Sequence, residues 1–181
     1  SRNNGAARQV PLAGVPAKAL EGYLERLIKM GLKVAICDQV EDPSVAKGIV
    51  RREVTETVTP GTVLTDGLLN SKRNNFLVAI TDPLLGFIGL ASLDLSTGEI
   101  SVKKIPVSEI QGELGCLDPK EILLPVSFEK GLSRSYSALQ LEEIIPVHLR
   151  TYRNSYLFEY GSACDALKSN YNVRDVKTLG F

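Results

Sequence analysis

The sequence has few of the residues on which most catalytic and metal sites depend. It contains one histidine, His148, and three cysteines, Cys37, Cys116 and Cys164, which are far apart and form no Cys-x-x-Cys pair. A histidine-rich metal site or a Ser-His triad would need more than this. Each cysteine stands beside apolar neighbours, which predicts buried free thiols in a reducing compartment.

Several motifs are also absent. No glycine is followed by lysine, so a Walker-type phosphate loop is excluded, and neither G-x-S-x-G nor H-E-x-x-H occurs. No apolar run approaches the ~18 residues that a membrane helix needs. The segment Ser1 to Gln9 is polar and basic, without the apolar core of a signal peptide. We therefore predict a soluble, cytoplasmic chain with no membrane association, no metal site and no catalytic residues of its own.

The composition is that of an ordinary globular protein. The 181 residues are 44% hydrophobic and 23% charged, and this length allows one or two cores. The net charge is zero, but residues 1–74 hold 11 Lys and Arg against 8 Asp and Glu, whereas residues 75–181 hold 10 against 13. The first part is better suited to a polyanion, although solvated charged surfaces also produce so small a difference.

The first 61 residues predict a small α/β module. Apolar residues recur at helical spacing over Pro16 to Met30, with proline at the start and Gly31 suited to a left-handed end. Two stretches rich in β-branched residues, Lys33 to Cys37 and Arg51 to Thr59, predict strands, and Pro60-Gly61 ends the second.

A change of pattern marks a second α/β module. Residues 62–74 are polar and predict a linker, with a short helical turn around Leu68. Three strands with short turns then predict an antiparallel meander: Phe76 to Thr81, Phe87 to Leu95 and Glu99 to Ile105. After the meander we expect a helix with a Ser108/Gln111 capping box that ends at Asp118-Pro119, strands at Glu121 to Pro125 and Ile144 to Leu149, and a capped helix from Ser162 to Ser169.

Two aspartates could carry chemistry. Asp82 and Asp94 end neighbouring predicted strands, and RNase H-like nucleases hold two divalent metals with such carboxylates, to which Asp118 or Glu121 could add a third. The alternative is that both aspartates stabilise turns, because Asp82 precedes Pro83 and Asp94 precedes Ser96-Thr97-Gly98. The turn interpretation is favoured, and a metal-dependent nuclease is kept as the second hypothesis.

The loop before the first predicted helix could approach a phosphate. Gly14 and Pro16 form a tight entry to the helix N-terminus, where backbone N–H groups are free, and Lys18 adds positive charge. A glycine and proline loop before any helix would offer the same geometry.

Linked motifs along nearly the whole chain give a family resemblance. They are Pro11-Leu12-Ala13-Gly14-Val15-Pro16, Leu27-Ile28-Lys29-Met30-Gly31, Val34-Ala35-Ile36-Cys37-Asp38-Gln39-Val40-Glu41-Asp42-Pro43, Arg52-Glu53-Val54 with Val58-Thr59-Pro60-Gly61-Thr62, Asp94-Leu95-Ser96-Thr97-Gly98, Pro119-Lys120-Glu121-Ile122-Leu123, Val173-Arg174-Asp175 and Gly180-Phe181. In this order they resemble the MutS family of DNA mismatch-repair ATPases.

The resemblance implies a division of the chain. Residues 1–61 would be the C-terminal part of the mismatch-binding domain, a partial mixed α/β module, and residues 75–181 a connector domain. The connector fold in the family is RNase H-like, with a mixed sheet flanked by helices and no nuclease activity. The family's Phe-x-Glu wedge is missing, because no phenylalanine has glutamate two positions later. Tyr23-Leu24-Glu25 has the spacing but lies on the amphipathic helix, where packing is expected.

The resemblance also implies partners. The DNA-backbone-proximal residues would be Gly14, Pro16 and Lys18, which would position the protein without discriminating between base sequences. Mismatched double-stranded DNA, a MutS homodimer, ATP and Mg²⁺ would belong to the full-length protein, and MutL would bind the connector. We expect this chain to be a non-catalytic fragment that binds no cofactor itself and carries signals between mismatch binding, ATPase and MutL.

Overall fold

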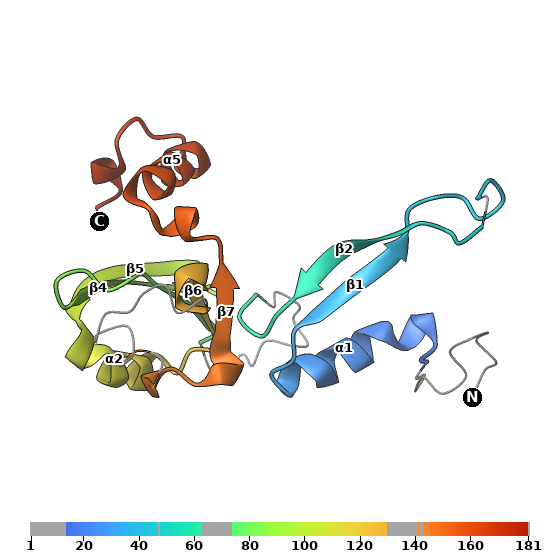
Figure 1. The fold of residues 1–181 in the computed structure, drawn as a ribbon, viewed down its shortest axis with the longest axis horizontal. Coiled ribbons are helices and arrows are strands. Elements are labelled where there is room, and N and C mark those ends of the chain that lie inside the picture. The colour runs from blue at the N-terminus through green and yellow to red at the C-terminus, as the bar shows by residue number, and fades with distance from the viewer. Residues whose placement is uncertain (1–13, 47, 63–73, 130–140, 142, 181) are drawn as a thin grey trace.

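The computed structural model describes residues 14–46, 48–62, 74–129, 141 and 143–180. The fold is mixed α/β, as predicted, and consists of two modules with separate sheets, one of two strands and one of five. Figure 1 shows the first module projecting away from the body of the second. Within the described residues, no helix is both long enough and apolar enough to span a lipid bilayer.

The first module is a helix beside a hairpin. A 3₁₀ turn, η1 (Ala17–Ala19), leads into α1 (Leu20–Lys29). Gly31 then takes φ 78°, which ends the helix as predicted, because glycine alone adopts the left-handed region without strain. The strands β1 (Val34–Gln39) and β2 (Arg52–Val58) pair antiparallel, and the register shifts by one residue between Ile36 and Cys37. The predicted helix and both predicted strands are confirmed.

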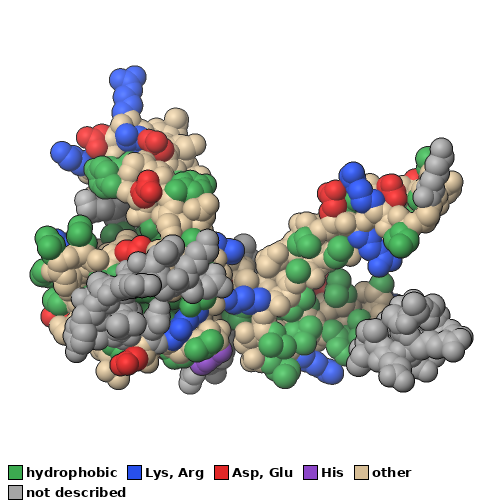
Figure 2. Space-filling model, viewed as in Figure 1, with side chains coloured by type: hydrophobic (Ala, Val, Ile, Leu, Met, Phe, Trp, Pro, Cys, Tyr) green, Lys and Arg blue, Asp and Glu red, His purple; other side chains and the backbone are tan. Residues whose placement is uncertain are grey.

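The described core of this module is small. Ile28 of α1 and Val58 of β2 are buried against each other, with Leu24, Val34 and Ile36 packed around them. Hydrophobic side chains gather on the visible surface of the first module around α1 (Figure 2), where Leu20, Tyr23 and Leu27 are exposed. Among its described residues, the first module therefore buries little apolar surface.

The second module is built on a five-stranded mixed sheet in the order β5-β4-β3-β6-β7. Its strands are β3 (Phe76–Ile80), β4 (Phe87–Asp94), β5 (Glu99–Pro106), β6 (Glu121–Pro125) and β7 (Arg150–Arg153). β3, β4 and β5 form the predicted antiparallel meander, whereas β6 pairs parallel with β3, and β7 parallel with β6. The parallel pairs arise because the chain crosses over between these strands.

One face of this sheet carries the main core. The buried residues are Val78, Ile80, Ile88, Leu90, Ile105, Val107, Ile110, Ile122, Leu124, Phe128, Leu141 and Ile145. After η2 (Val107–Glu109), α2 (Ile110–Leu117) lies along this face, and α5 (Tyr160–Tyr171) stands on the other side of the sheet (Figure 1). The shorter helical elements are α3 (Val126–Glu129), η3 (Val147–Leu149), η4 (Ser155–Phe158) and η5 (Val176–Leu179).

Three local predictions for the second module are corrected. No side-chain cap forms at Ser108, which lies inside η2, because Pro106 in extended conformation already sets the entry to the helix. The strand predicted over Ile144 to Leu149 is wrong. Pro146 has no N–H to donate to a ladder, and β7 begins only at Arg150. The helix predicted from Ser162 starts at Tyr160, without a side-chain cap.

The thiols are free, but their predicted burial is wrong for two of them. Cys37 lies on the outer part of the β1–β2 hairpin and Cys116 on α2, and both are exposed; Cys164 is half-buried. Apolar sequence neighbours did not predict burial because, in a strand or a helix, adjacent residues face different sides.

Candidate interdomain joint

The three residues predicted to approach DNA lie together at the entry to the first helix. Gly14, Pro16 and Lys18 are all exposed. The Pro16 carbonyl accepts a 2.9 Å hydrogen bond from the Ala19 N–H, which closes the turn that presents Lys18. This loop is at the end of α1 that is remote from Gly31 and the hairpin base.

The two aspartates of the nuclease hypothesis do not meet. Phe76 pairs with Asp94 and Ile80 with Leu90, so Asp94 lies at the start of β3 and Asp82 just beyond its end. Six residues of strand separate these positions, about 20 Å. The strands are antiparallel, so their C-terminal ends lie at opposite edges of the sheet, and the predicted pairing of these carboxylates is wrong.

A third carboxylate does not complete such a site either. Glu121 pairs with Leu77 and Asp94 with Phe76, so the two acids face opposite sides of the sheet. Asp118 is exposed and its carboxylate is 2.6 Å from Lys120 Nζ. In the part of the chain that the structure describes, no three His, Cys, Asp or Glu residues are grouped to hold a metal ion.

Asp94 instead stabilises the turn between β4 and β5. Its Oδ1 accepts hydrogen bonds from the backbone N–H of Ser96 at 2.9 Å and from the Ser96 hydroxyl at 2.7 Å. The side chain is fully buried. Burial raises the pKa of the Asp94 carboxyl, but hydrogen bonds from Ser96, Asn75 and Thr97 together lower that pKa below 3.8. The turn interpretation of Asp94 is confirmed.

Acid is expected to destabilise the second module through Asp94. Its pKa is lower in the folded chain, so its contribution to stability is complete above 3.8 and is lost as the pH falls through the lower, folded value. Asp94→Asn should remove this pH dependence and lower the free energy of unfolding at neutral pH by about 1–3 kcal/mol. Amide exchange of β3 and β4, measured between about pH 2 and 7, would check this. Exposed Asp118→Asn is the control, and a wild-type acid response in Asp94→Asn would contradict the prediction.

Asp82 also has a structural partner. The Ser127 hydroxyl at the start of α3 donates a 2.8 Å hydrogen bond to Asp82 Oδ2, which ties the end of β3 to this helix. The other oxygen, Oδ1, is buried and, among the described residues, accepts no hydrogen bond. Asp82 thus connects β3 to α3 at the edge of the sheet remote from Asp94.

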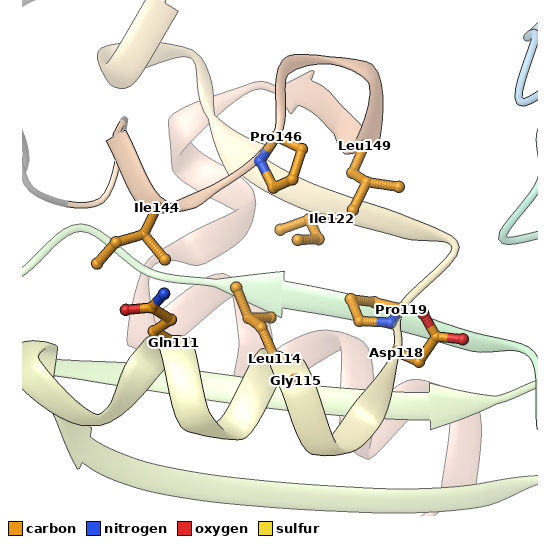
Figure 3. Close-up of a pocket in the computed structure, with 9 residues that line it drawn as sticks. All are labelled: Gln111, Leu114, Gly115, Asp118, Pro119, Ile122, Ile144, Pro146 and Leu149. Atoms are coloured by element: carbon orange, nitrogen blue, oxygen red, sulfur yellow. The ribbon is translucent and has the colours of Figure 1, made fainter.

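A pocket of about 250 Å³ lies beside α2 (Figure 3). Its lining is Gln111, Leu114, Gly115, Asp118, Pro119, Ile122, Ile144, Pro146 and Leu149. Only Gln111 and Asp118 have polar side chains, and in Figure 3 the Asp118 carboxylate points away from the other lining residues. No pair of titratable groups converges here, so the pocket offers no acid–base chemistry.

The most developed polar cluster lies where the two modules meet. Glu121, at the start of β6, is 1% exposed. The Thr151 hydroxyl of β7 donates to Glu121 Oε1 at 2.5 Å, and the Thr59 hydroxyl of the first module donates to Oε2. Thr59 and Thr62 place their hydroxyl oxygens 2.8 Å apart. The Glu121 carboxylate is therefore shared between Thr151 of its own sheet, 30 positions away in the sequence, and Thr59 of the first module, 62 positions away.

A second contact lies beside the first. Lys33, just before β1, donates from Nζ to the Arg150 carbonyl oxygen at 2.6 Å and to the Thr151 hydroxyl. The Thr151 hydroxyl thus accepts a hydrogen bond from Lys33 and donates one to Glu121. We call the five residues Lys33, Thr59, Gly61, Glu121 and Thr151 the interdomain joint.

Gly61 is in the joint because no side chain fits there. A Cβ at this position would lie 2.6 Å from Glu121 Cβ, 2.9 Å from Glu121 Oε2 and 3.1 Å from Leu77 Cδ1. The backbone of the first module approaches β6 closely, as only glycine permits. Sequence reasoning treated Pro60-Gly61 as a strand end and missed this contact. The signal in the sequence is the Thr59-Pro60-Gly61-Thr62 motif, because Pro60-Gly61 alone is enough to end a strand and the two flanking threonines are not needed for that.

Comparison with known proteins identifies both modules. The family model described as MutS domain I matches residues 1–67, and MutS domain II matches residues 75–181. The chain belongs to the MutS family. The part of the predicted linker that covers residues 63–73, with the turn expected at Leu68, lies outside the described residues, so the predicted domain limits stay a prediction.

Curated relatives named as MutS match nearly the whole chain. It is 37% identical to the DNA mismatch repair protein MutS of Chlorobaculum tepidum over 99% of its length, and 36% identical to that of Alkaliphilus oremlandii over 100%. The MutS of Methanothrix thermoacetophila is 51% identical over 65% of the chain. The chain spans 20% of the Chlorobaculum tepidum protein. Its two modules are thus MutS domains I and II, with the joint between them.

Proposed function

We propose that this chain is the mismatch-binding and connector part of a longer, cytoplasmic mismatch-repair protein, and that it performs no catalysis itself. The observation that supports the proposal best is the joint. Two modules with separate sheets are joined through a buried carboxylate, while the candidate catalytic acids Asp82 and Asp94 lie about 20 Å apart on their strands. This arrangement is suited to holding one module in a defined orientation on the other, and it is less suited to catalysis.

The proposed DNA contact is Gly14, Pro16 and Lys18, at the exposed start of α1. Backbone N–H groups at a helix entry and a lysine ammonium would bind phosphate oxygens, which positions a protein on DNA without discriminating between base sequences. ATP and Mg²⁺ are proposed to bind the full-length homodimer outside these two domains, because the sequence here lacks the Gly-Lys dipeptide that a Walker-type phosphate loop requires. MutL is proposed to bind the second module.

Salt-dependent binding tests the DNA contact. We expect this chain to bind duplex DNA weakly at low salt, equally with and without a mismatch, and to release it at moderate salt as counterion release requires. Lys18→Gln should reduce the slope of log K against log salt by about 0.9. Lys177→Gln, which removes a charge from η5 instead, is the control. Tight, mismatch-selective binding would contradict the proposal, as would equal slopes for the two variants.

Binding of MutL tests the connector assignment separately. Adding MutL to the isotope-labelled chain should shift amide signals within residues 75–181 and leave those of α1 unchanged. Shifts confined to the first module would contradict the assignment of MutL to the connector.

A further inference from the structure

The joint holds the first module at two points. Lys33 precedes β1 and Thr59 follows β2, and the residues beside them, Val34 and Val58, are paired across the hairpin. Both anchors therefore sit at the base of the hairpin, a strand spacing of about 5 Å apart. Two anchors on neighbouring strands fix a direction, which a single contact would leave free to rotate.

The rest of the first module extends away from this base (Figure 1). Between Lys33 and the Gly14 to Lys18 loop lie α1 and η1. These two elements have 13 residues together, which is about 20 Å of helix. A tilt of about 10° at the joint would move the Lys18 end by about 3–4 Å over this length. That is more than a hydrogen bond to a phosphate tolerates.

The hydrogen bonds between residues of the interdomain joint are all donated toward the Glu121 carboxylate. Lys33 donates to Thr151, Thr151 donates to Glu121, and Thr59 donates to the other oxygen of Glu121. A carboxylate can only accept, so each threonine hydroxyl commits its single proton to it. Removing either threonine hydroxyl would leave one oxygen of the buried Glu121 carboxylate without a hydrogen-bond donor. If the two modules then separate at this point, water can reach that oxygen.

We propose that Glu121 is a positioning residue, which sets the orientation of the first module on the connector and so places the Gly14 to Lys18 loop. The DNA role of that loop rests on the proposed function, whereas the positioning itself does not. The substitution that isolates it is Thr59→Val, because valine keeps the shape of threonine and removes only the hydroxyl that joins the modules. Glu121→Ala removes both acceptors and is the second variant.

Native thiols provide the measurement. Cys37 on β1 and Cys116 on α2 are exposed and lie on different modules, so with Cys164→Ser they carry one spin label each. In the full chain without DNA, electron–electron double resonance should give one narrow distance distribution for the parent. Thr59→Val and Glu121→Ala should widen it at least about twofold, because two-point anchoring is lost. Glu113→Gln, whose partner Lys103 lies 2.8 Å away within the second module, should leave it narrow.

The two proposals fail in different ways. A distribution as narrow in Thr59→Val as in the parent, with β3 amide protection unchanged, would overturn the positioning role of Glu121. Widening in Glu113→Gln equal to that in Thr59→Val would overturn it as well. A widened distribution together with no DNA binding by the parent would support positioning and sink only the DNA contact.

Discussion

Replacing Ile122 with alanine is expected to lower the free energy of unfolding of the second module by about 2–5 kcal/mol. Ile122 is fully buried in β6, between β3 and β7, and belongs to the main core. It also forms a wall of the 250 Å³ pocket beside α2, so truncation would enlarge a space that is already present (Figure 3). Domains are stable by only about 5–15 kcal/mol, so this is a large share.

Native-state amide exchange of β3 and β4 would measure the Ile122 effect in the second module alone. Ile100→Ala on β5 makes the same chemical change at a side chain that is 37% exposed, and it should cost less than about 1 kcal/mol. Equal losses in the two variants would show that burial in β6 is not what stabilises the sheet.

Gly61→Ala is expected to weaken the interdomain joint by about 1–3 kcal/mol. The added Cβ would meet Glu121 Cβ at 2.6 Å, and this atom is fixed to the backbone of β6 and cannot turn away. The first module must then move off the connector, or β6 must shift. Protection of the Val58 amide, next to the joint, reports the loss most directly.

Gly22→Ala is the matched control for Gly61. Gly22 lies inside α1, and apart from its chain neighbours and the backbone of its own helix no atom lies within 4 Å of its Cβ position, so alanine there should stabilise the helix by about 0.5–1 kcal/mol. Both changes restrict the unfolded chain equally, so the opposite signs isolate the contact at the joint. A stabilising Gly61→Ala would show that the two backbones are not in close contact.

Local patterns predicted most of the elements. The helix ending at Gly31 and the meander from Phe76 to Ile105 follow from periodicity and from turn residues, which act within a few positions of the chain. The error at Ile144 to Leu149 has a local cause too. An apolar run suggested a strand, but Pro146 displaced the strand to Arg150.

The site was not predictable in the same way. Grouping Asp82 with Asp94 conflicts with the antiparallel meander that the sequence itself predicts, because the C-terminal ends of neighbouring antiparallel strands lie at opposite edges of the sheet, as the register shows. Glu121 was considered as a third metal ligand because it is an acid at the start of the next predicted strand. Its real partners, Thr59 and Thr151, lie 62 and 30 positions away, and no periodicity in one sequence connects residues at that separation.

The one-residue shift in register at Ile36 and Cys37 divides the β1–β2 hairpin into two parts. Before it, Val34 and Ile36 pack toward α1; beyond it, the side chains of Cys37 to Gln39 and of their partners are exposed. Among the described residues, this outer part has no buried side chain, so its sequence should vary with little effect on folding. The bulge thus marks the point beyond which the β1–β2 hairpin can be lengthened, labelled or given a new recognition sequence. The base of the hairpin would keep its contacts with the connector.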